Sequence, residues 1–175
     1  MELRIAAPLP PTFATVFAEH AALVWRTMRR LGLREADAED LAQEVFMVIH
    51  RKLPTFEARS KLSTWIYGIC VNVAADHHRR AHVRREVPTD DLPDRGVPGG
   101  QDAALAAAES RARLDRALET LDDDKRAVFV LYELEEVPMA EIAVVVGAPL
   151  QTVYTRLHAA RRQLAAVLAP TREDA

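Results

Sequence analysis

The sequence is poor in cysteine and in long apolar runs. Cys70 is the only cysteine among 175 residues and lies in the apolar run 65–73, so no internal disulfide can form and a cysteine-based metal site is excluded. We expect Cys70 to be a packed core thiol. No apolar run reaches the roughly 18 to 20 residues of a membrane span, and residues 1–11 lack a basic segment followed by an apolar core. We therefore expect a cytoplasmic protein without a membrane span.

The sequence also lacks the basic excess that is usual in nucleic-acid-binding proteins, because its formal net charge is −3. The distribution of the charges matters more than their sum. Residues 34–44 hold one arginine against five acids, residues 76–86 hold four arginines against two acids, and residues 150–168 hold three arginines and no acid. Each patch alone is typical of a solvated helix face. Together they also fit one protein-binding surface and two nucleic-acid-binding surfaces.

The spacing of the apolar residues predicts an all-α fold. They recur every three or four residues through most of the sequence, and no segment shows the sustained alternation of a strand. Residues 87–101 are the exception, because they hold three prolines and three glycines and cannot form a helix. We predict two small helical domains, residues 12–86 and 103–169, joined by a flexible linker at 87–102.

Residues 138–168 have the pattern of a helix-turn-helix. Pro138 fits the first position of a helix, Gly147 fits a left-handed helix end, and Pro149 separates the first helix from the second. At about 100° per residue, one face of the second helix is apolar and is expected to be buried: Leu150, Val153, Leu157, Ala160 and Leu164. The opposite face is polar and carries Gln151, Thr155, His158 and Arg162.

This polar face is a candidate surface for reading DNA. Glutamine can bond bidentately to adenine and arginine to guanine, and threonine can contact a base edge or the thymine methyl group. Base contacts come mainly from the start of such a helix, so the predicted base-reading residues are Gln151, Thr152, Thr155 and Arg156. We expect Arg161 and Arg162 to hold phosphates instead. The alternative is an ordinary helical hairpin with a polar outer face.

A helix with an acidic start is expected over residues 37–50. Its apolar residues recur at helical spacing, and they are Leu41, Val45, Val48 and Ile49. The acids crowd the start of the helix, where the helix dipole favours negative charge. Stabilisation of the helix start accounts for this pattern without any partner.

A second helix is expected from about residue 62 to residue 80, after a short loop at 55–61. Its core stripe is Leu62, Ile66, Ile69 and Val73. One flank of this helix carries an aromatic ring, an amide and charged groups, from Trp65, Asn72, Asp76 and Arg79. Such a flank, next to a basic helix end, can serve as a platform for unstacked bases. A half-buried tryptophan beside solvated polar groups is the alternative.

Together these segments resemble the extracytoplasmic-function (ECF) sigma factors of RNA polymerase, in the sigma-70 superfamily, which join a region 2 to a region 4 through a linker. The sequence DAEDLAQEVF at 37–46 is similar to the family's helix for the clamp helices of the polymerase β′ subunit. The sequence TWIYGICVN at 64–72 is similar to its promoter-melting helix. The similarity to region 4 runs through residues 118–121, 126–131, 141–143, 147, 152–153 and 156–158. It covers nearly the whole chain, and the motifs in this order are strongly specific.

The resemblance implies a sigma factor that binds core RNA polymerase, directs promoter-specific transcription initiation, and has no catalytic residue, cofactor or metal. The residues implied to meet β′ are Asp37, Asp40, Leu41, Gln43, Glu44 and Phe46. The loop 55–63, with Arg59, Ser60 and Lys61, would capture a flipped base of the minus-ten element. The opened strand would be held by Trp65, Asn72, Asp76, Arg79 and Arg80. The minus-thirty-five element would be read in the major groove by Gln151, Thr152, Thr155, Arg156, His158, Arg161 and Arg162.

The resemblance implies two more partners, the β flap of the polymerase for region 4 and an anti-sigma factor that holds the chain inactive. Three positions depart from the family's pattern. Ala58 stands where relatives often have glycine, so the capture loop is expected to be stiffer. Pro138 replaces a common serine cap, and Tyr154 replaces a frequent lysine and removes a phosphate partner. These departures leave the promoter sequence open.

Two other classes of protein compete with this interpretation. The first is a helix-turn-helix transcriptional regulator that acts without core polymerase, and the acidic segment 37–44 argues against it. The second is a metal-dependent enzyme built on His77, His78 and His82. His78 and His82 are four residues apart and could share a metal, but the four neighbouring arginines oppose a cation. A pH-sensing role for these histidines rests on residue type alone.

Overall fold

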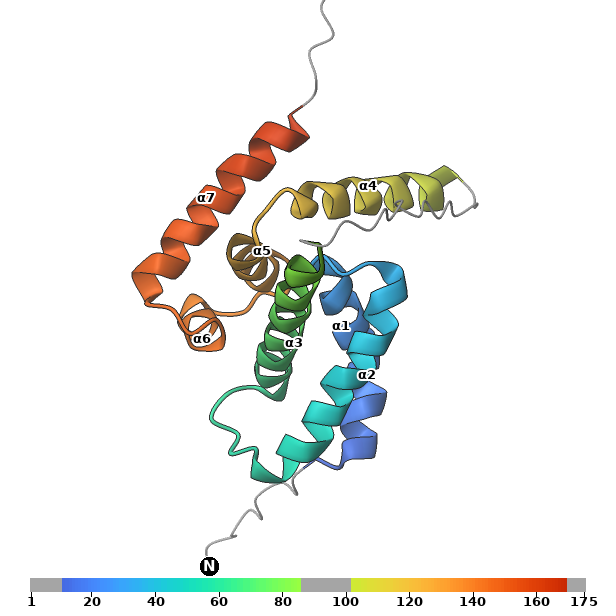
Figure 1. Cartoon of the computed structure of the whole chain (residues 1–175), viewed down its shortest axis with the longest axis vertical. Helices are drawn as coiled ribbons and strands as arrows, with labels where there is room; N and C mark the ends of the chain where they lie inside the picture. Colours follow the sequence, from blue (N-terminus) through green and yellow to red (C-terminus); the bar gives the residue numbers. More distant parts are fainter. Residues whose placement is uncertain (1–10, 86–101, 170–175) are drawn as a thin grey trace, which may run out of the picture.

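The structure is a computed structural model that describes residues 11–85 and 102–169 (Figure 1). All the regular elements in these two ranges are helices, so the predicted all-α fold is confirmed. The predicted linker falls almost entirely on residues 86–101, which lie outside the described residues, while residue 102 already belongs to a helix. The flexibility of the linker and the domain limits 12–86 and 103–169 stay predictions.

Three long helices form the N-terminal domain: α1 (Phe13–Arg30), α2 (Glu35–Lys52) and α3 (Leu62–Arg85). Thr12 caps α1 by accepting a hydrogen bond from the Thr15 amide. Between α1 and α2, Gly32 has a φ of +89°, a conformation that residues with a Cβ rarely adopt. A short 3-10 turn, η1 (Leu53–Thr55), ends α2 before the loop that leads to α3.

The core of the N-terminal domain follows the predicted apolar spacing. Ile66, Ile69 and Val73 on α3 are buried, as are Leu41, Val45 and Ile49 on α2, while Leu62 and Val48 pack at the edge of the same cluster. Cys70 is completely buried among them and free, so the expectation of a core thiol is confirmed. Burial raises the pKa of this thiol, which keeps it protonated and unreactive at neutral pH.

The C-terminal domain holds α4 (Asp102–Glu119), α5 (Asp123–Phe129), a π-helical turn η2 (Val130–Leu134), α6 (Met139–Val145) and α7 (Leu150–Leu168). Helices α6 and α7 form the predicted helix-turn-helix. Gly147 has a φ of +61°, as its place at a left-handed helix end requires. Pro138 and Pro149 stand at the N-caps of α6 and α7, so Pro138 lies one position before the first helical residue, Met139, and not at the predicted first helical position.

The apolar face of α7 is buried except at its start. Val153, Leu157, Ala160 and Leu164 are buried, whereas 45% of Leu150 is exposed. The expectation that Leu150 belongs to the core is therefore wrong. Leu150 is the first residue of α7, directly after Pro149, and the end of a helix extends beyond the neighbours that cover its middle.

The two domains pack against each other. Helix α3 contacts α6, and α1 contacts α4. Ala127 of α5 is buried in the core cluster of the N-terminal domain, and Tyr67 of α3 is buried in a cluster with Val128, Ile142 and Leu157 of the C-terminal domain. The described residues therefore share apolar clusters across the domain boundary, with α7 on the outside and α3 in the middle (Figure 1).

Candidate nucleic-acid and polymerase interfaces

The polar face of α7, which we call the α7 face, consists of Gln151, Thr155, His158 and Arg162. All four residues are exposed, and Thr152 beside them is half-buried. The Thr155 hydroxyl donates to the carbonyl of Gln151 at 3.0 Å, which leaves the threonine methyl group for other contacts. The structure therefore brings the predicted base-reading residues together at the start of one exposed helix.

Two arginines of α7 have partners inside the C-terminal domain. Arg156 forms an ion pair with Asp124 at the start of α5. Arg161 pairs with Glu133 at 2.6 Å and lies over the ring of Tyr132, 5.6 Å from the ring centroid. Both arginines therefore already have a carboxylate partner within the C-terminal domain. Arg162 is exposed, and it belongs to the α7 face.

One flank of α3, which we call the α3 flank, carries Trp65, Asn72, Asp76 and Arg79. Trp65 is half-buried and packs against Phe56 of the preceding loop, with ring centroids 5.1 Å apart. Asn72 and Arg79 are exposed, and Arg79 forms an ion pair with Asp76 one turn earlier. Arg80 is exposed beside them. These residues lie on α3 with Phe56 packed against the ring of Trp65, and their role as a platform for bases stays a prediction.

The predicted capture loop has one strained residue. Ala58 has a φ of +52°, a left-handed conformation that glycine adopts without cost and alanine does not. The alanine at this position therefore strains the loop, and the expected stiffness of the loop stays a prediction. Arg59 and Lys61 are exposed, and Arg59 forms an ion pair with Glu57 at 2.5 Å. The Ser60 hydroxyl donates to the Lys61 carbonyl at 3.4 Å.

The acidic start of α2 divides into exposed and buried residues. Asp40 and Gln43 are exposed, and Asp37 and Glu44 are half-buried. Leu41 and Phe46 are both 8% exposed and belong to the core, so they support this surface from below. Phe46 also packs against the ring of Phe17 at 4.7 Å, and 48% of Phe17 is exposed. An apolar edge from α1 thus borders the acidic surface, and the sequence interpretation missed it.

The histidines at the end of α3 contact carboxylates. His78 Nδ1 lies 2.8 Å from an oxygen of Asp123 on α5, and His77 lies 3.9 Å from Asp37 on α2. The hydrogen bond from His78 lowers the pKa of Asp123, although burial opposes the shift. Burial lowers the pKa of His77, with Asp37 acting in the opposite direction. Among residues 11–85 and 102–169, no group of three or more possible ligands is placed to hold a metal ion.

Three residues that the sequence interpretation missed join the two domains. Arg126 of α5 is 7% exposed and donates to the carbonyls of Leu118, Leu121 and Leu31, the last in the N-terminal domain at 3.0 Å. Glu135 accepts a hydrogen bond from the Tyr67 hydroxyl at 2.5 Å. The only charged residue of the otherwise apolar stretch 126–131 is Arg126, and this pattern is a sequence signal for its buried polar contact. No local pattern signals the pair of Glu135 and Tyr67.

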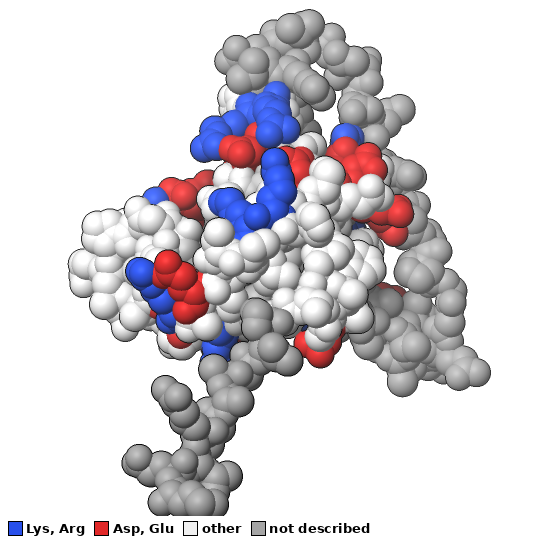
Figure 2. Space-filling view, turned by 90° about the horizontal axis from the view of Figure 1, so that it is seen from below, with Lys and Arg blue, Asp and Glu red and all other residues white. Residues whose placement is uncertain are grey.

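Charge of both signs is spread over the surface in small groups. Figure 2 shows one face of the molecule, on which clusters of Lys and Arg lie beside clusters of Asp and Glu and most of the remaining described surface is uncharged. This arrangement agrees with the ion pairs of Arg59, Arg79, Arg156 and Arg161.

Among the described helices, none combines the length and the apolar character that a membrane span needs.

The comparisons with known proteins match both domains. The family model for sigma-70 region 2 matches residues 16–84, and the model for sigma-70 region 4 matches residues 111–164. Together these ranges hold most of α1 to α3 and most of the helix-turn-helix, so both candidate DNA surfaces and the acidic surface lie within matched residues.

Two relatives extend the match over most of the chain. The chain is 32% identical over 162 residues to the ECF RNA polymerase sigma factor SigE of Mycolicibacterium smegmatis, covering 91% of this chain and 62% of that protein. It is 31% identical over 147 residues to a probable RNA polymerase sigma-C factor of Mycobacterium bovis, covering 84% of this chain and 78% of that protein. The chain thus spans less than two thirds of the length of SigE.

A solved structure has the same fold. The sigma factor RpoE of Bartonella quintana, in complex with the anti-sigma factor NepR, superposes with a TM-score of 0.72 at 21% identity, covering 91% of this chain and 98% of that one. The two domain matches, the relatives and the fold agree with the residues described above. The chain therefore belongs to the ECF sigma factors of RNA polymerase, the DNA-binding initiation factors of the sigma-70 superfamily.

Proposed function

We propose that this chain binds core RNA polymerase and carries it to promoters with a minus-ten and a minus-thirty-five element, without catalysing a reaction of its own. The observation that supports this most strongly is the presence of two separate DNA-suited surfaces and one acidic surface on a single chain. The α3 flank suits an opened strand, and the α7 face suits duplex DNA. In this proposal the chain acts in the cytoplasm, where polymerase and chromosome meet.

The acidic surface of α2 is assigned to the clamp helices of β′. Asp40 and Gln43 are exposed and Glu44 is half-buried, so these three can contact a partner directly. Asp37 is half-buried and already lies 2.9 Å from Arg34, whereas Leu41 and Phe46 hold the helix in place from the core. Carboxylates on this surface would steer the chain toward a basic partner.

The C-terminal domain is assigned to the minus-thirty-five element and to the β flap. Gln151, Thr152 and Thr155 lie at the start of α7, where base contacts are made in a helix-turn-helix, and Arg156, His158, Arg161 and Arg162 follow. Arg156 has to exchange Asp124 for a base edge. The N-terminal domain is assigned to the minus-ten element, with Arg59, Ser60 and Lys61 in the capture loop and the α3 flank with Arg80 behind it.

An anti-sigma factor is proposed as the third partner. Family membership supports this assignment, and the RpoE structure of similar fold is a complex with the anti-sigma factor NepR. The rival function, a helix-turn-helix regulator that works without polymerase, would use the α7 face but leaves the α3 flank and the acidic surface of α2 without a role.

The proposed function is tested by run-off transcription with core polymerase on genomic DNA. We expect defined transcripts that appear only when the chain is added, and their start sites give the promoter. The double variant Asp40→Arg with Glu44→Arg should abolish binding to core polymerase without changing the fold. A matched control, Glu109→Arg with Glu119→Arg on the exposed side of α4, makes the same change in charge and should bind normally. Duplex binding without any effect of polymerase would favour the rival function.

A further inference from the structure

The start of α7 exposes two large apolar residues, which we call the apolar row of α7. Leu150 is 45% exposed and Tyr154 is 42% exposed, while Val153 between them is completely buried. Neither residue of the row packs against one of the three core clusters that the described residues form. Side chains four residues apart on a helix are neighbours. The two residues therefore form one continuous patch that the core does not use.

The apolar row borders the α7 face. A step of four residues turns by only about 40° around a helix, so Tyr154 lies between Leu150 and His158, and His158 belongs to the α7 face. Thr155 is exposed next to Tyr154, and its hydroxyl donates to the carbonyl of Gln151 at 3.0 Å, which leaves its methyl group for other contacts. The apolar row is thus an edge of the surface that is proposed to enter the major groove.

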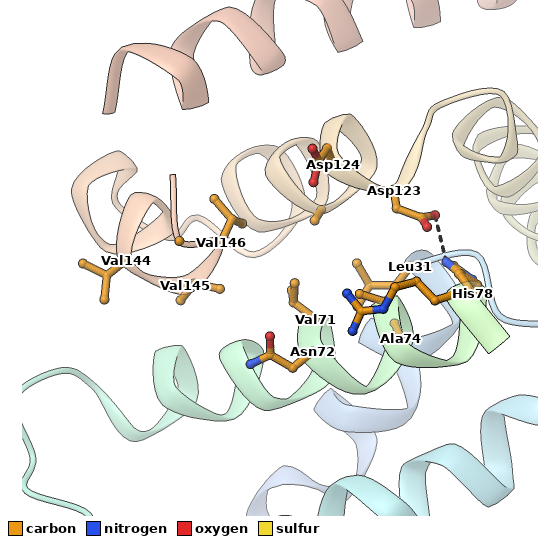
Figure 3. A pocket seen from close by; sticks show the side chains of 14 residues that line it. Leu31, Val71, Asn72, Ala74, His78, Asp123, Asp124, Val144, Val145 and Val146 are labelled. Atoms are coloured by element: carbon orange, nitrogen blue, oxygen red, sulfur yellow. Dashed lines mark ion pairs between the residues drawn. The ribbon is translucent and has the colours of Figure 1, made fainter. Parts of the chain in front are cut away.

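The contact between the domains does not account for the apolar row. The apolar residues at the end of α6 do belong to that contact, because Val144, Val145 and Val146 line a cavity of about 330 Å³ together with residues of α3 and α5 (Figure 3). Leu150 and Tyr154 are not among the residues that line this cavity. The helix-turn-helix therefore has one apolar surface at the N-terminal domain and a second one outside that cavity.

Duplex DNA offers apolar groups that match this row. Thymine displays its C5 methyl group in the major groove, where apolar side chains contact it. Such contacts are made mainly by the start of the recognition helix, and the apolar row occupies the first two turns of α7. Helix α7 carries no acid that would repel phosphates, and Arg161 lies two turns beyond Tyr154. Position, charge and chemistry thus agree with DNA as the occupant.

We propose that Leu150 and Tyr154 are specificity-determining residues of the minus-thirty-five contact, and that they read the methyl groups of thymines in the major groove. The polar residues of the α7 face read hydrogen-bonding groups, whereas the apolar row reads a feature that hydrogen bonds do not detect. The element therefore carries A·T pairs opposite the start of α7. This inference rests on the proposed function, because it assumes that α7 enters the groove of the minus-thirty-five element.

Replacement of thymine by deoxyuridine tests the inference without any change in the protein. Deoxyuridine pairs with adenine as thymine does and lacks only the methyl group. Each thymine of the minus-thirty-five element, on either strand of the run-off promoter, is replaced in turn. Binding of the holoenzyme, formed from the full chain and core polymerase, is then measured. We expect about a fourfold loss of affinity at one or two positions, as for one buried methyl group, and no loss elsewhere.

Two variants assign the sensitive positions to residues. Leu150→Ala and Tyr154→Ala should each weaken binding to the thymine-containing promoter. Each should also remove the effect of deoxyuridine at one position, because the methyl group there has lost its partner. Val167→Ala is the matched control, since Val167 is 47% exposed near the other end of the same helix. It should change neither the affinity nor the pattern of sensitive positions.

The outcomes separate this inference from the proposed function. The inference is wrong if the element has no thymine on either strand, if the holoenzyme binds all the deoxyuridine promoters as tightly as the thymine promoter, or if both variants stay fully sensitive to deoxyuridine. It is also wrong if Leu150→Ala loses binding to core polymerase without DNA, because the row would then contact protein. If the unmodified chain yields no polymerase-dependent transcript, the proposed function itself fails.

Discussion

The two candidate DNA surfaces differ in how they relate to the rest of the molecule. The α7 face lies on an outer helix whose opposite side is buried in its own domain, so all four of its residues are exposed. The α3 flank lies on a central helix that also carries the contacts to α5 and α6. The α7 face is therefore remote from the contact between the domains, whereas the α3 flank borders that contact, although Asn72, Arg79 and Arg80 are exposed.

The largest expected effect is the loss of stability when the buried hydrogen bonds of Arg126, which join the two domains, are removed. Arg126→Ala leaves buried carbonyls of Leu118, Leu121 and Leu31 without their donor, and we expect it to lower the free energy of unfolding by about 3 to 5 kcal/mol. Arg113→Ala is the matched control, because the exposed Arg113 also donates to one carbonyl, that of Leu168 at 2.7 Å. Its cost should be about 0.5 kcal/mol. Urea unfolding measures both, and similar costs would show that burial at Arg126 is unimportant.

The next effect sharpens the description of the α7 face. Arg156→Ala should lose roughly 1 to 3 kcal/mol of binding at particular positions of the promoter, because a base contact discriminates between sequences. Arg162→Ala should weaken binding to all sequences alike and flatten its salt dependence, because a phosphate contact does not discriminate. Binding of the holoenzyme to a set of single-base promoter variants at two salt concentrations measures both. Equal losses on every DNA from Arg156→Ala would contradict base reading by this residue.

A smaller effect concerns the loop in front of α3. Ala58→Gly should relieve the left-handed strain at φ +52° and raise the free energy of unfolding by about 1 kcal/mol. The same substitution at the exposed Ala22 in α1 should lower it by about 0.5 to 1 kcal/mol, because glycine disfavours a helix. Thermal or urea unfolding of the two variants measures these opposite signs. A loss of stability at both positions would mean that Ala58 is not strained.

The smallest effect reports whether the domains touch in solution. The hydrogen bond from His78 on α3 lowers the pKa of Asp123 on α5. The charge of Arg126 lowers this pKa further, whereas the charge of Asp122 raises it. The His78→Gln variant should therefore raise the pKa of Asp123 toward its usual value, whereas His82→Gln, at an exposed position, should not. Carboxyl carbon shifts in an NMR pH titration measure this.

The sign of the pH effect follows from the direction of the shift. A lowered carboxyl pKa stabilises the folded state above the usual aspartate pKa, and the stabilisation is lost as the pH falls through the lowered value. Asp123 is about half exposed, so the effect on stability is small and the titration is the better readout. An unchanged Asp123 pKa in His78→Gln would mean that α5 does not lie against α3 in solution.

Local patterns predicted the elements of this fold well. The spacing of Ile66, Ile69 and Val73 gave the core side of α3, and Gly147 with Pro149 located the turn of the helix-turn-helix, because these signals depend on neighbouring residues only. The polar side of α7 followed from the same geometry. Leu150 and Pro138 were misplaced, and both lie at the start of a helix. The periodicity of a sequence does not show how a helix end lies relative to its neighbours.

Long-range polar contacts could not be predicted in the same way. Glu135 and Tyr67 are 68 residues apart and Arg126 and Leu31 are 95 apart, and no spacing rule joins such pairs. The sequence therefore indicated two domains and their surfaces but not their packing. The family resemblance implies that Leu41 and Phe46 meet the polymerase; both are buried in the free chain, and their contact with the polymerase stays a prediction.

The distance between the domains in the free and the polymerase-bound chain tests the central claim most directly. Spin labels at Arg51→Cys on α2 and Ala166→Cys on α7 occupy exposed positions, and the buried Cys70 does not take up a label. The account predicts one narrow, short distance in the free chain and a longer one after core polymerase is added. A free chain that already shows the longer distance would contradict the packing of α5 and α6 against α3.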